Sequence, residues 1–489
     1  MAALVRVPLL LHDGLWRDNA YIYVTVSAPS YALFFHRLIE TEWHPPLYFL
    51  ATYYWVKLVG ISELSLKTLP FLCSVLTVPA IYRLGKLASN AAVGLLAAII
   101  FALSPLAIVL SSEDLYPVVG LFCVVLAYLV MKARVEPLTL NGLACVTAVT
   151  AVTVYTHYVA LLYVPLLIVW ATFSPRGVKH GIAVGAALLL GLWTFIFWLP
   201  VFVYQRHLYL PFNSPSLLVQ KGRYIVVALY DLMPVPTPFL AAAFCVALFG
   251  MVVFLLRRGA INRTVLALGA IFAVLLLAET AERLTIARYI FPIYGLLCVF
   301  FAWVLDAFWR RALSGGETPR RKWWAAAGVA FCAIVVIADI AYLVQVSAVP
   351  KSGIRSFAAS VPFDRQTLYV IAPDYMASTF AFYSRNAGVA YRGFARVDEP
   401  ELFRLDGYAP LWSSADVVEQ GFEAMVKIAR GYRRLDVVVD DDARDRGALL
   451  YGKVWPFLHL IESHYRLENR RSYAGRYESV SVYRFSLDQ

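Results

Sequence analysis

The sequence has 489 residues, of which 61% are hydrophobic and only 15% are charged, a composition too apolar for a typical soluble protein. The net charge of +11 could indicate nucleic-acid binding, but the water-soluble tail from Lys351 carries 19 basic and 18 acidic residues and is nearly neutral. We therefore exclude nucleic acid as a partner and expect a protein that crosses the lipid bilayer several times.

The chain opens on a short apolar piece, residues 1–11, which is followed by a long loop up to residue 65. The piece is too short to cross a bilayer, which takes about 20 apolar residues. It would be the end of an outward span that begins upstream, or a short re-entrant segment. Residues 45–59 are also apolar, but both of their flanks must lie outside. We predict a helix in the outer membrane interface there, where its Tyr and Trp side chains are favoured.

Ten apolar runs follow, and many of the turns between them carry Lys or Arg. Because basic turns favour the cytoplasmic side, we place them inside the cell and the tail outside. These basic turns are Arg83/Lys86, Lys132/Arg134, Arg176/Lys179, Arg257/Arg258/Arg263 and Arg310 to Lys322. The predicted spans are about 66–82, 92–110, 115–131, 139–156, 158–174, 181–203, 237–256, 262–279, 288–309 and 323–346. The external loops are then 12–65, 111–114, 204–236 and 280–287.

The tail alternates apolar and charged residues, as a soluble domain does. The patterns predict strands at 367–372 and 434–439, helices near 375–386, 415–430 and 446–464, and a hairpin over 465–485 that turns at Ala474-Gly475. Asp440 to Asp442 are interpreted as a solvated strand end. We expect this domain to shape access of an acceptor rather than to carry out chemistry.

The predicted fold class is a polytopic α-helical membrane protein with a C-terminal soluble α/β domain. About 10-11 transmembrane helices are expected in residues 1-348, and the soluble domain is expected in residues 349-489. None of the six cysteines lies in the tail, so no disulfide framework or thiolate metal site is predicted.

Two acidic sites in the external loops are candidates for catalysis. Asp18 lies where the first apolar piece ends, and a carboxylate at such a boundary can have a raised pKa and act as a general base. Glu113 and Asp114 form an adjacent pair in a turn between Pro105 and Pro117. Because adjacent carboxylates repel each other, a cation or a hydroxyl-bearing substrate would relieve the repulsion.

Three further residues occupy unusual positions near the outer ends of spans. His157 lies between two spans with almost no loop around it. Arg288 begins a span and could contact lipid headgroups or clamp the phosphate of a lipid-linked substrate. Asp339 is a carboxylate inside the last span, and both a structural contact and a function stay open for it.

Several short motifs of the membrane portion occur in an order that is typical of one family. They are Leu15-Trp16-Arg17-Asp18-Asn19-Ala20, His44-Pro45-Pro46-Leu47-Tyr48, Gly60 to Pro70, Ser104-Pro105 through Glu113-Asp114-Leu115-Tyr116, Thr156-His157-Tyr158 and Arg288-Tyr289-Ile290-Phe291-Pro292. Together they resemble GT-C membrane glycosyltransferases of the protein O-mannosyltransferase and lipid A aminoarabinose transferase type. Two positions depart from that family, because its D-E motif reads Asp18-Asn19 here and Leu115 replaces an Arg of its second motif.

The resemblance implies a GT-C fold and transfer of a sugar from a polyprenyl-phosphate donor to an extracytoplasmic acceptor hydroxyl, with inversion. Asp18 would be the general base, and Arg288 would neutralise the leaving phosphate. Glu113 or Asp114 would orient the acceptor or the sugar, and a divalent metal held together with His44 is left open. The other positions implied in substrate binding are His44, Tyr116, His157 and Tyr289.

The implied partners are the lipid-linked donor, membrane lipids, and a glycan, lipid or protein acceptor. The implied location is a multi-pass cell membrane protein with its active site and tail on the extracytoplasmic side. A transporter or flippase of a lipid-linked glycan is a second hypothesis, although internal repeats and mid-membrane polar residues are not found. A non-catalytic subunit of an envelope glycan assembly complex is a third, which Asn19 and Leu115 keep open. The sequence defines neither the sugar nor the acceptor.

Overall fold

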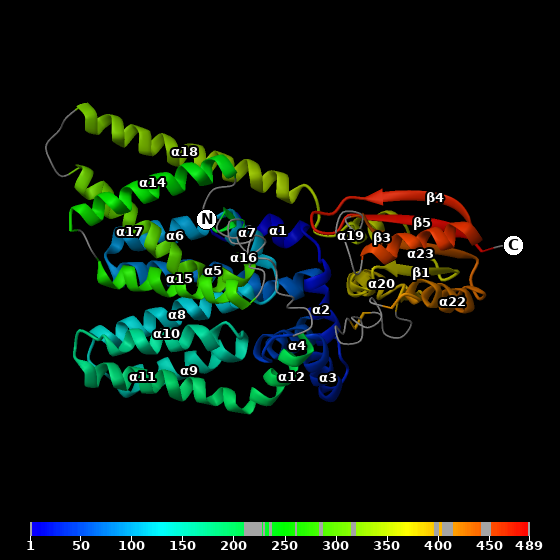
Figure 1. Ribbon diagram of the computed structural model, residues 1–489, viewed down its shortest axis with the longest axis horizontal. Helices are drawn as coiled ribbons and strands as arrows, with labels where there is room; N and C mark the ends of the chain where they lie inside the picture. Colours follow the sequence, from blue (N-terminus) through cyan, green and yellow to red (C-terminus); the bar gives the residue numbers. More distant parts are fainter. Residues whose placement is uncertain are drawn as a thin grey trace.

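A computed structural model describes residues 2–209, 227, 230–233, 237–259, 262–282, 287–313, 319–395, 401–402, 414–441 and 451–487. The molecule is elongated, with a helical bundle at one end and a small domain built on a sheet at the other (Figure 1). Four short helices near the N-terminus lie at the junction of these two parts (Figure 1). They are α1 (Val7–His12), α2 (Arg17–Val26), α3 (Tyr31–Thr41) and α4 (Leu47–Val59).

The ten predicted spans fall on the helices of the bundle, and the predicted fold class is confirmed. Seven of them correspond to single helices, whereas 92–110, 181–203 and 288–309 are each divided into shorter helices. The bundle helices are α5 (Glu63–Ala88), α6 (Ala91–Leu103), α7 (Pro105–Val109), α8 (Tyr116–Val135), α9 (Leu140–Thr156), α10 (Ala160–Thr172), α11 (Val178–Trp193), α12 (Leu199–Tyr209), α14 (Pro238–Arg257), α15 (Arg263–Glu282), α16 (Ala287–Ile290), α17 (Tyr294–Leu313) and α18 (Pro319–Ser347). Within the described residues, five helices are long and apolar enough to cross a bilayer, and one bent pair could make a sixth. Four shorter apolar helices account for the remaining predicted spans. The predicted loop 204–236 falls mostly outside the described residues.

The bent pair consists of α6 and α7, whose axes differ by 60°. Pro105 begins α7, and a proline cannot donate the backbone hydrogen bond that would continue α6. Ser104 caps the new helix, because its Oγ accepts the N–H of Ala107 at 3.4 Å. The bend and a short 3₁₀ helix, Leu110–Ser112, bring the following acidic turn to the junction with the C-terminal domain.

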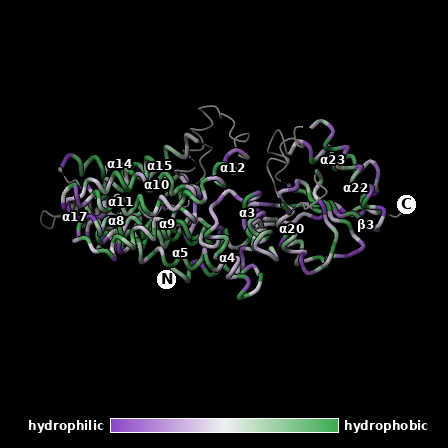
Figure 2. Tube along the Cα trace, turned by 90° about the horizontal axis from the view of Figure 1, so that it is seen from below, coloured by the Kyte–Doolittle hydropathy of each residue, from purple (hydrophilic) through white to green (hydrophobic). Residues whose placement is uncertain are grey.

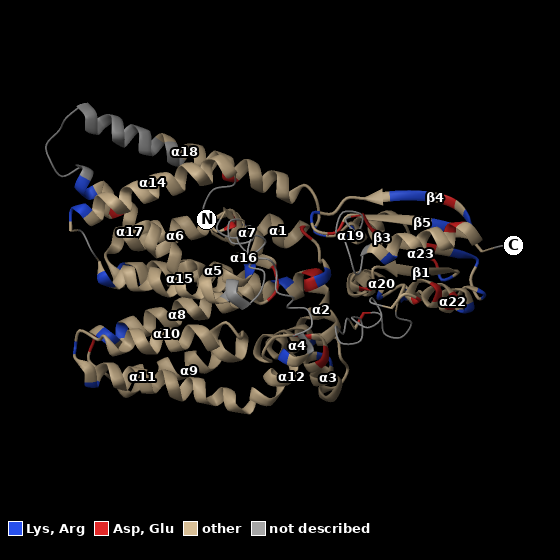
Figure 3. Cartoon of the chain, in the orientation of Figure 1, with Lys and Arg blue, Asp and Glu red and all other residues tan. Residues whose placement is uncertain are grey.

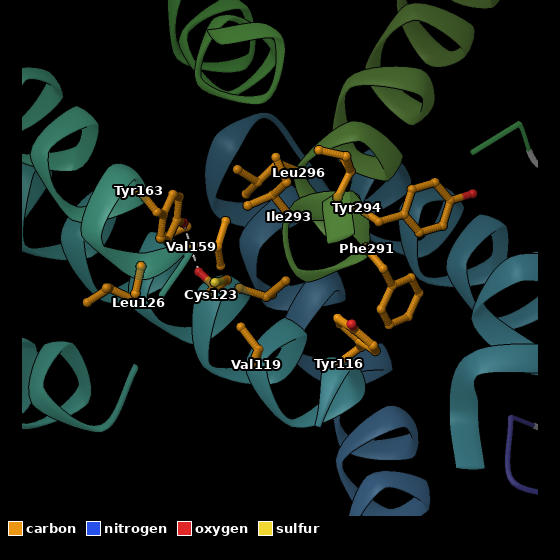
Figure 4. Packing of buried hydrophobic residues seen from close by; sticks show 14 of the residues in the cluster. Tyr116, Val119, Cys123, Leu126, Val159, Tyr163, Phe291, Ile293, Tyr294 and Leu296 are labelled. Atoms are coloured by element: carbon orange, nitrogen blue, oxygen red, sulfur yellow. Dashed lines mark hydrogen bonds between the residues drawn. The ribbon is translucent and has the colours of Figure 1, made fainter. Parts of the chain in front are cut away.

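The bundle is packed through its apolar side chains and through close backbone approach. Buried residues of α8, α10 and α17 meet in its centre, where the Tyr163 hydroxyl donates to the Cys123 carbonyl at 2.9 Å (Figure 4). At Gly94 a Cβ atom would lie 2.5 Å from the Tyr82 carbonyl oxygen, so only glycine lets α6 lie this close to α5.

The distribution of polarity follows the two parts of the molecule. Hydrophobic residues dominate the bundle, whereas hydrophilic residues are frequent in the C-terminal domain (Figure 2). Lys and Arg gather at the end of the bundle that is remote from this domain, around the ends of α14, α15 and α17 (Figure 3). The basic ends of these three helices therefore lie at one end of the bundle, as the prediction of a shared side requires.

The C-terminal domain contains a five-stranded sheet in the order β2-β1-β3-β5-β4. β1 is parallel to β2 and β3, and β5 is antiparallel to β3 and β4. Its elements are α19 (Gly353–Ser360), β1 (Thr367–Ala372), α20 (Ala377–Ser384), β2 (Tyr391–Gly393), α22 (Val417–Ala429), β3 (Arg434–Asp440), α23 (Tyr451–His464), β4 (Arg466–Tyr473) and β5 (Val480–Ser486). The predicted strands, helices and hairpin are all present, and β2 is an additional strand.

Both faces of this sheet are covered by helices. Leu368 and Val370 of β1 pack with α22 and α23, whereas Tyr369 and Ile371 pack with α19 and α20. Alternate side chains of a strand point to opposite faces, so a strand with two covered faces is apolar throughout. The predicted boundary between residues 348 and 349 falls between α18 and α19.

Candidate active site

The predicted site residues lie where the bundle meets the C-terminal domain, around α2, α16 and the turn before α8 (Figure 1). Asp18 stands in the first turn of α2, where a carboxylate is favoured by the helix dipole. Its Oδ2 accepts a short hydrogen bond from Arg288 Nη1, and its Oδ1 accepts one from Arg17 Nε at 3.1 Å. The structure therefore joins two residues that the sequence analysis had singled out separately, 270 positions apart.

The electrostatic state of Asp18 differs from our expectation. Burial by itself would raise the pKa of this carboxyl, but the guanidinium groups of Arg288 and Arg17 outweigh burial and hold the pKa below its usual value. The raised pKa that the boundary position of Asp18 would allow is therefore not found. The cause is the ion pair with Arg288, which no local sequence pattern reveals.

A raised pKa is found instead at the neighbouring Asp114. Burial and the charge of Asp18 raise the pKa of Asp114 to about 7, and its Oδ1 accepts the N–H of Leu115 at 2.7 Å. Asp114 has a φ of 37°, in the left-handed region that few residues other than glycine adopt. Glu42 belongs to the same acidic group, since burial and the charge of Asp114 raise its pKa as well.

Glu113 does not share this environment, although it precedes Asp114 in the chain. Its carboxylate lies 3.5 Å from Lys351 Nζ, which also lies 3.1 Å from Asp13. Asp13 in turn pairs with Arg476 at 2.9 Å. Lys351 and Asp13 are fully buried, so this cluster ties the bundle to the start of the C-terminal domain. A cation next to the acidic pair was predicted, and Lys351 stands beside Glu113.

The other predicted substrate-binding residues form a continuous row of rings. His44 and His157 have ring centroids 5.0 Å apart, and His157 lies 6.0 Å from Tyr116. Tyr116 lies 6.2 Å from Tyr289, and the Arg288 guanidinium lies 5.3 Å from the Tyr289 ring. The row thus runs from the histidines to the Asp18–Arg288 pair. The structure brings all of the residues predicted for the site to this junction, with the Glu113 carboxylate paired to Lys351.

A cavity of about 460 Å³ lies beside this pair, between the bundle and the C-terminal domain. The bundle and its leading helices contribute Trp16, Arg17 and Arg288, and the C-terminal domain contributes several residues that the sequence analysis did not select. These missed residues are Tyr375, Asp440, Arg476, Tyr477 and Glu478. A cavity of this size that combines aromatic and charged side chains is suited to a polar small molecule or the end of a larger one.

One of the missed residues corrects an earlier interpretation. Asp440 was assigned to a solvated strand end, but it is 2% exposed and accepts a short hydrogen bond from the Tyr375 hydroxyl. Asp441 bonds to Ser481 at 2.6 Å, and Asp442 lies outside the described residues. A strand that ends in consecutive acidic residues was the available signal, although it does not say which part of the molecule covers that end.

Asp339 lies on α18 and is 5% exposed. Its Oδ1 has no hydrogen-bond partner within the part of the chain that the structure describes. It stands one turn before Tyr342, which lines the cavity. Among the described residues, no three His, Cys, Asp or Glu side chains come together in a way that would hold a metal ion.

Comparison with known proteins gives the same assignment as the motifs. The family model for dolichyl-phosphate-mannose-protein mannosyltransferases matches residues 43–204. The crystal structure of ArnT from Cupriavidus metallidurans in the apo state superposes with a TM-score of 0.60 over 98% of this chain and 95% of that chain, at 13% identity. This chain has the GT-C glycosyltransferase fold. The predicted resemblance is confirmed at the level of fold.

Two other solved structures share the GT-C fold over most of the chain. ArnT from Cupriavidus metallidurans bound to undecaprenyl phosphate has a TM-score of 0.54 at 12% identity, covering 99% of this chain and 96% of that chain. The apo oligosaccharyltransferase of Archaeoglobus fulgidus has a TM-score of 0.54 at 11% identity, covering 90% of this chain and 69% of that chain. No curated protein sequence matches this chain.

Proposed function

We propose that this protein is a glycosyltransferase that moves a sugar from a polyprenyl-phosphate donor to an acceptor hydroxyl outside the cytoplasm, with inversion at the anomeric carbon. The observation that carries the proposal is the Asp18–Arg288 pair beside a polar cavity at the end of a GT-C bundle. The relatives support the donor class, since one of the superposed structures contains undecaprenyl phosphate.

Arg288 is the proposed anchor for the donor phosphate. Its guanidinium stands at the start of α16 and already bonds a carboxylate, so an anionic oxygen of similar geometry suits it. As the bond from the anomeric carbon to the phosphate oxygen breaks, its electron pair stays on the phosphate, and Arg288 neutralises the growing charge.

Asp18 is the proposed general base. When the donor phosphate takes the Arg288 guanidinium, Asp18 loses one of its two cationic partners and keeps only Arg17. The freed carboxylate accepts the proton of the acceptor hydroxyl while that oxygen bonds to the anomeric carbon. Asp18 would then become an effective base only after the donor has bound. Until then, Arg288 keeps its carboxylate deprotonated.

Asp114 is the proposed orienting residue and the alternative base. Its pKa of about 7 is better matched to neutral pH than that of Asp18, but only Asp18 directly contacts the proposed phosphate anchor. Glu113 does not take part in the proposed chemistry, because Lys351 neutralises it in the buried cluster.

The function is tested with full-length protein in lipid nanodiscs and a set of radiolabelled polyprenyl-phosphate pentoses and hexoses. We expect loss of label from one donor, release of polyprenyl phosphate and a labelled acceptor product. A transporter or a non-catalytic subunit would leave every donor intact, which would overturn the proposal.

A further inference from the structure

One wall of the cavity is formed by Trp16 together with residues of the C-terminal domain, and it lies next to Arg288, the proposed donor anchor. Arg288 lies 5.7 Å from the Trp16 ring, and Trp16 in turn lies 4.6 Å from the Tyr477 ring between centroids. On the other side, the Arg17 guanidinium covers both the Trp16 and the Tyr375 rings, at 5.2 and 4.8 Å. An unbroken series of contacts therefore connects the donor anchor to this wall.

The wall combines apolar ring faces with groups that donate and groups that accept hydrogen bonds. Trp16 is 8% exposed, and its Nε1–H finds no hydrogen-bond partner in the portion of the chain that is described. Glu478 is 2% exposed and uses Oε1 to accept the Arg17 N–H at 3.2 Å. Because buried polar groups normally have partners, an unpaired donor at a cavity indicates a ligand that can accept.

The charge of the cavity is informative about that ligand. Its lining includes three arginines against four carboxylates, namely Arg17, Arg288 and Arg476 against Glu113, Asp231, Asp440 and Glu478. Behind the lining, Asp18 pairs with Arg288, Asp13 pairs with Arg476, and Lys351 pairs with Glu113. With these partners included, four cations face six carboxylates. A second anionic group would be repelled once the donor phosphate has bound.

These features match a sugar without charged substituents. Each sugar hydroxyl both donates and accepts, which satisfies an indole N–H and a carboxylate together. Burial raises the pKa of Glu478 to about 7, so near neutral pH this carboxyl can act as donor as well as acceptor. The half-buried Tyr477 ring at the cavity offers an apolar surface against which the C–H groups of a sugar ring can pack.

The geometry points to an acceptor subsite for an uncharged glycan end, formed by Trp16 with Tyr477 and Glu478 of the C-terminal domain. This inference rests on the proposed function and adds the class of the acceptor to it. An acceptor hydroxyl held at this wall would approach the Asp18–Arg288 pair from the side of the C-terminal domain. The domain would thus select the acceptor, while the bundle holds the donor.

The first test compares three acceptor probes with the full-length protein in nanodiscs and the donor that it consumes. The probes are a neutral hexose trisaccharide, the same trisaccharide with a terminal phosphate, and a peptide rich in serine and threonine. We expect transfer to the neutral trisaccharide at a kcat/KM at least about tenfold above the other two. Preference for the phosphorylated probe or the peptide would overturn the inference and leave the proposed function intact.

The second test assigns the subsite to its residues. Glu478→Gln keeps an acceptor for the Arg17 N–H, and Trp16→Phe removes the indole N–H but keeps a ring. We expect each to raise KM for the trisaccharide about tenfold, with KM for the donor within about twofold of the wild type. Glu468→Gln, on the exposed face of β4, serves as the matched control and should change neither. Equal changes in both KM values, or none in either variant, would overturn the subsite.

Direct binding separates a failure of this inference from a failure of the proposed function. Saturation-transfer NMR of the trisaccharide with nanodisc protein needs no turnover. If no donor is consumed, binding that is lost in Glu478→Gln and kept in Glu468→Gln would still support the subsite. An absence of binding to the wild-type protein would overturn it.

Discussion

At the scale of single residues, the ion pair between Asp18 and Arg288 determines the chemistry that we propose. The pair couples the expected base to the expected phosphate anchor, so the two roles cannot be separated by inspecting either residue alone. Asp114 supplies a second carboxylate, whose pKa is raised in part by the charge of Asp18. It therefore binds a proton more tightly than Asp18 does. Substitutions at these three positions should therefore give distinguishable kinetic results.

Asp18→Asn removes the proton acceptor and keeps the shape of the side chain. We expect a loss of about 10²–10⁴-fold in kcat, the usual contribution of a general base. Donor binding should be at least as tight as in the wild type, because asparagine competes less strongly than the carboxylate for Arg288. The measurement is single-turnover kinetics together with equilibrium binding of the donor. Near-normal turnover in Asp18→Asn and a comparable loss in Asp114→Asn would move the role to Asp114.

The pH dependence separates the same two carboxylates. The value of kcat/KM follows the protonation of the free enzyme, and a base must be deprotonated to act. Because Arg288 and Arg17 lower the pKa of Asp18, activity should fall only below the usual pKa range of aspartate. Asp114→Asn should show the same acidic limb as the wild type. An acidic limb near pH 7 that disappears in Asp114→Asn would instead identify Asp114, whose pKa is about 7, as the base.

Arg288 should be sensitive to the loss of charge more than to the exact shape of the side chain. We expect Arg288→Ala to raise KM for the donor by at least about tenfold and Arg288→Lys to raise it less, since lysine keeps a point charge but loses the bidentate geometry. Steady-state kinetics with varied donor checks this. If both variants keep the wild-type KM, the phosphate is bound elsewhere.

At the scale of elements, the site depends on how short helices and turns are joined at the end of the bundle. Lys351 lies just after α18, Asp13 lies between α1 and α2, and Glu113 lies before α8. The buried charges of these three residues meet at the junction of the two parts of the molecule. From this position, we infer that they fix the C-terminal domain against the bundle, so that its residues line the cavity.

Lys351→Met should destabilise the protein strongly. Removing one partner of a buried ion cluster leaves uncompensated charge and costs about 3–5 kcal/mol. Unfolding of the detergent-purified protein in denaturant checks this, with Lys427→Met on the exposed face of α22 as the control. The double variant Lys351→Met/Glu113→Gln should recover part of the loss. A single variant as stable as the control would show that the cluster contributes little.

The helix predicted at the outer interface can be tested by its depth in the bilayer. α4 comprises 13 residues, and a helix of that length spans about 20 Å, less than the hydrocarbon core. In a variant without native cysteines, nitroxide labels at Tyr54 and Leu58 should lie at similar shallow depths. A label at Leu189 on α11, which faces outward from the bundle, should lie deeper. A steady change of depth along α4 would show that it crosses the membrane.

At the scale of the whole molecule, the sidedness of the two ends determines where the reaction can take place. The basic residues at the remote end of the bundle predict that this end is cytoplasmic and that the C-terminal domain is outside (Figure 3). The donor headgroup and the acceptor would then meet at the extracytoplasmic surface, in the cavity between bundle and domain.

Reporter fusions test this orientation. Alkaline phosphatase fused after Gln489 should be active, because it folds only outside the cytoplasm, whereas the same enzyme inserted after Arg258 should be inactive. Green fluorescent protein at the two positions should give the opposite result. An inactive phosphatase at Gln489 together with an active one after Arg258 would show the opposite orientation, and the proposed extracytoplasmic reaction would then be wrong.

The sequence by itself determined the positions of the membrane helices, the end of the bundle that carries the basic turns, and most elements of the C-terminal domain. These features depend on the length of apolar runs, the charge of turns and the alternation of side chains, which are local properties. The residues that we predict for the site also come from local patterns, since His44, Tyr116, His157 and Tyr289 lie in short motifs.

Only the tertiary structure decided how they are placed together. It paired Arg288 with Asp18 and Lys351 with Glu113, and it brought Glu478 to the cavity. Such pairings join positions hundreds of residues apart, and they follow from the packing of whole helices and domains rather than from any pattern along the chain.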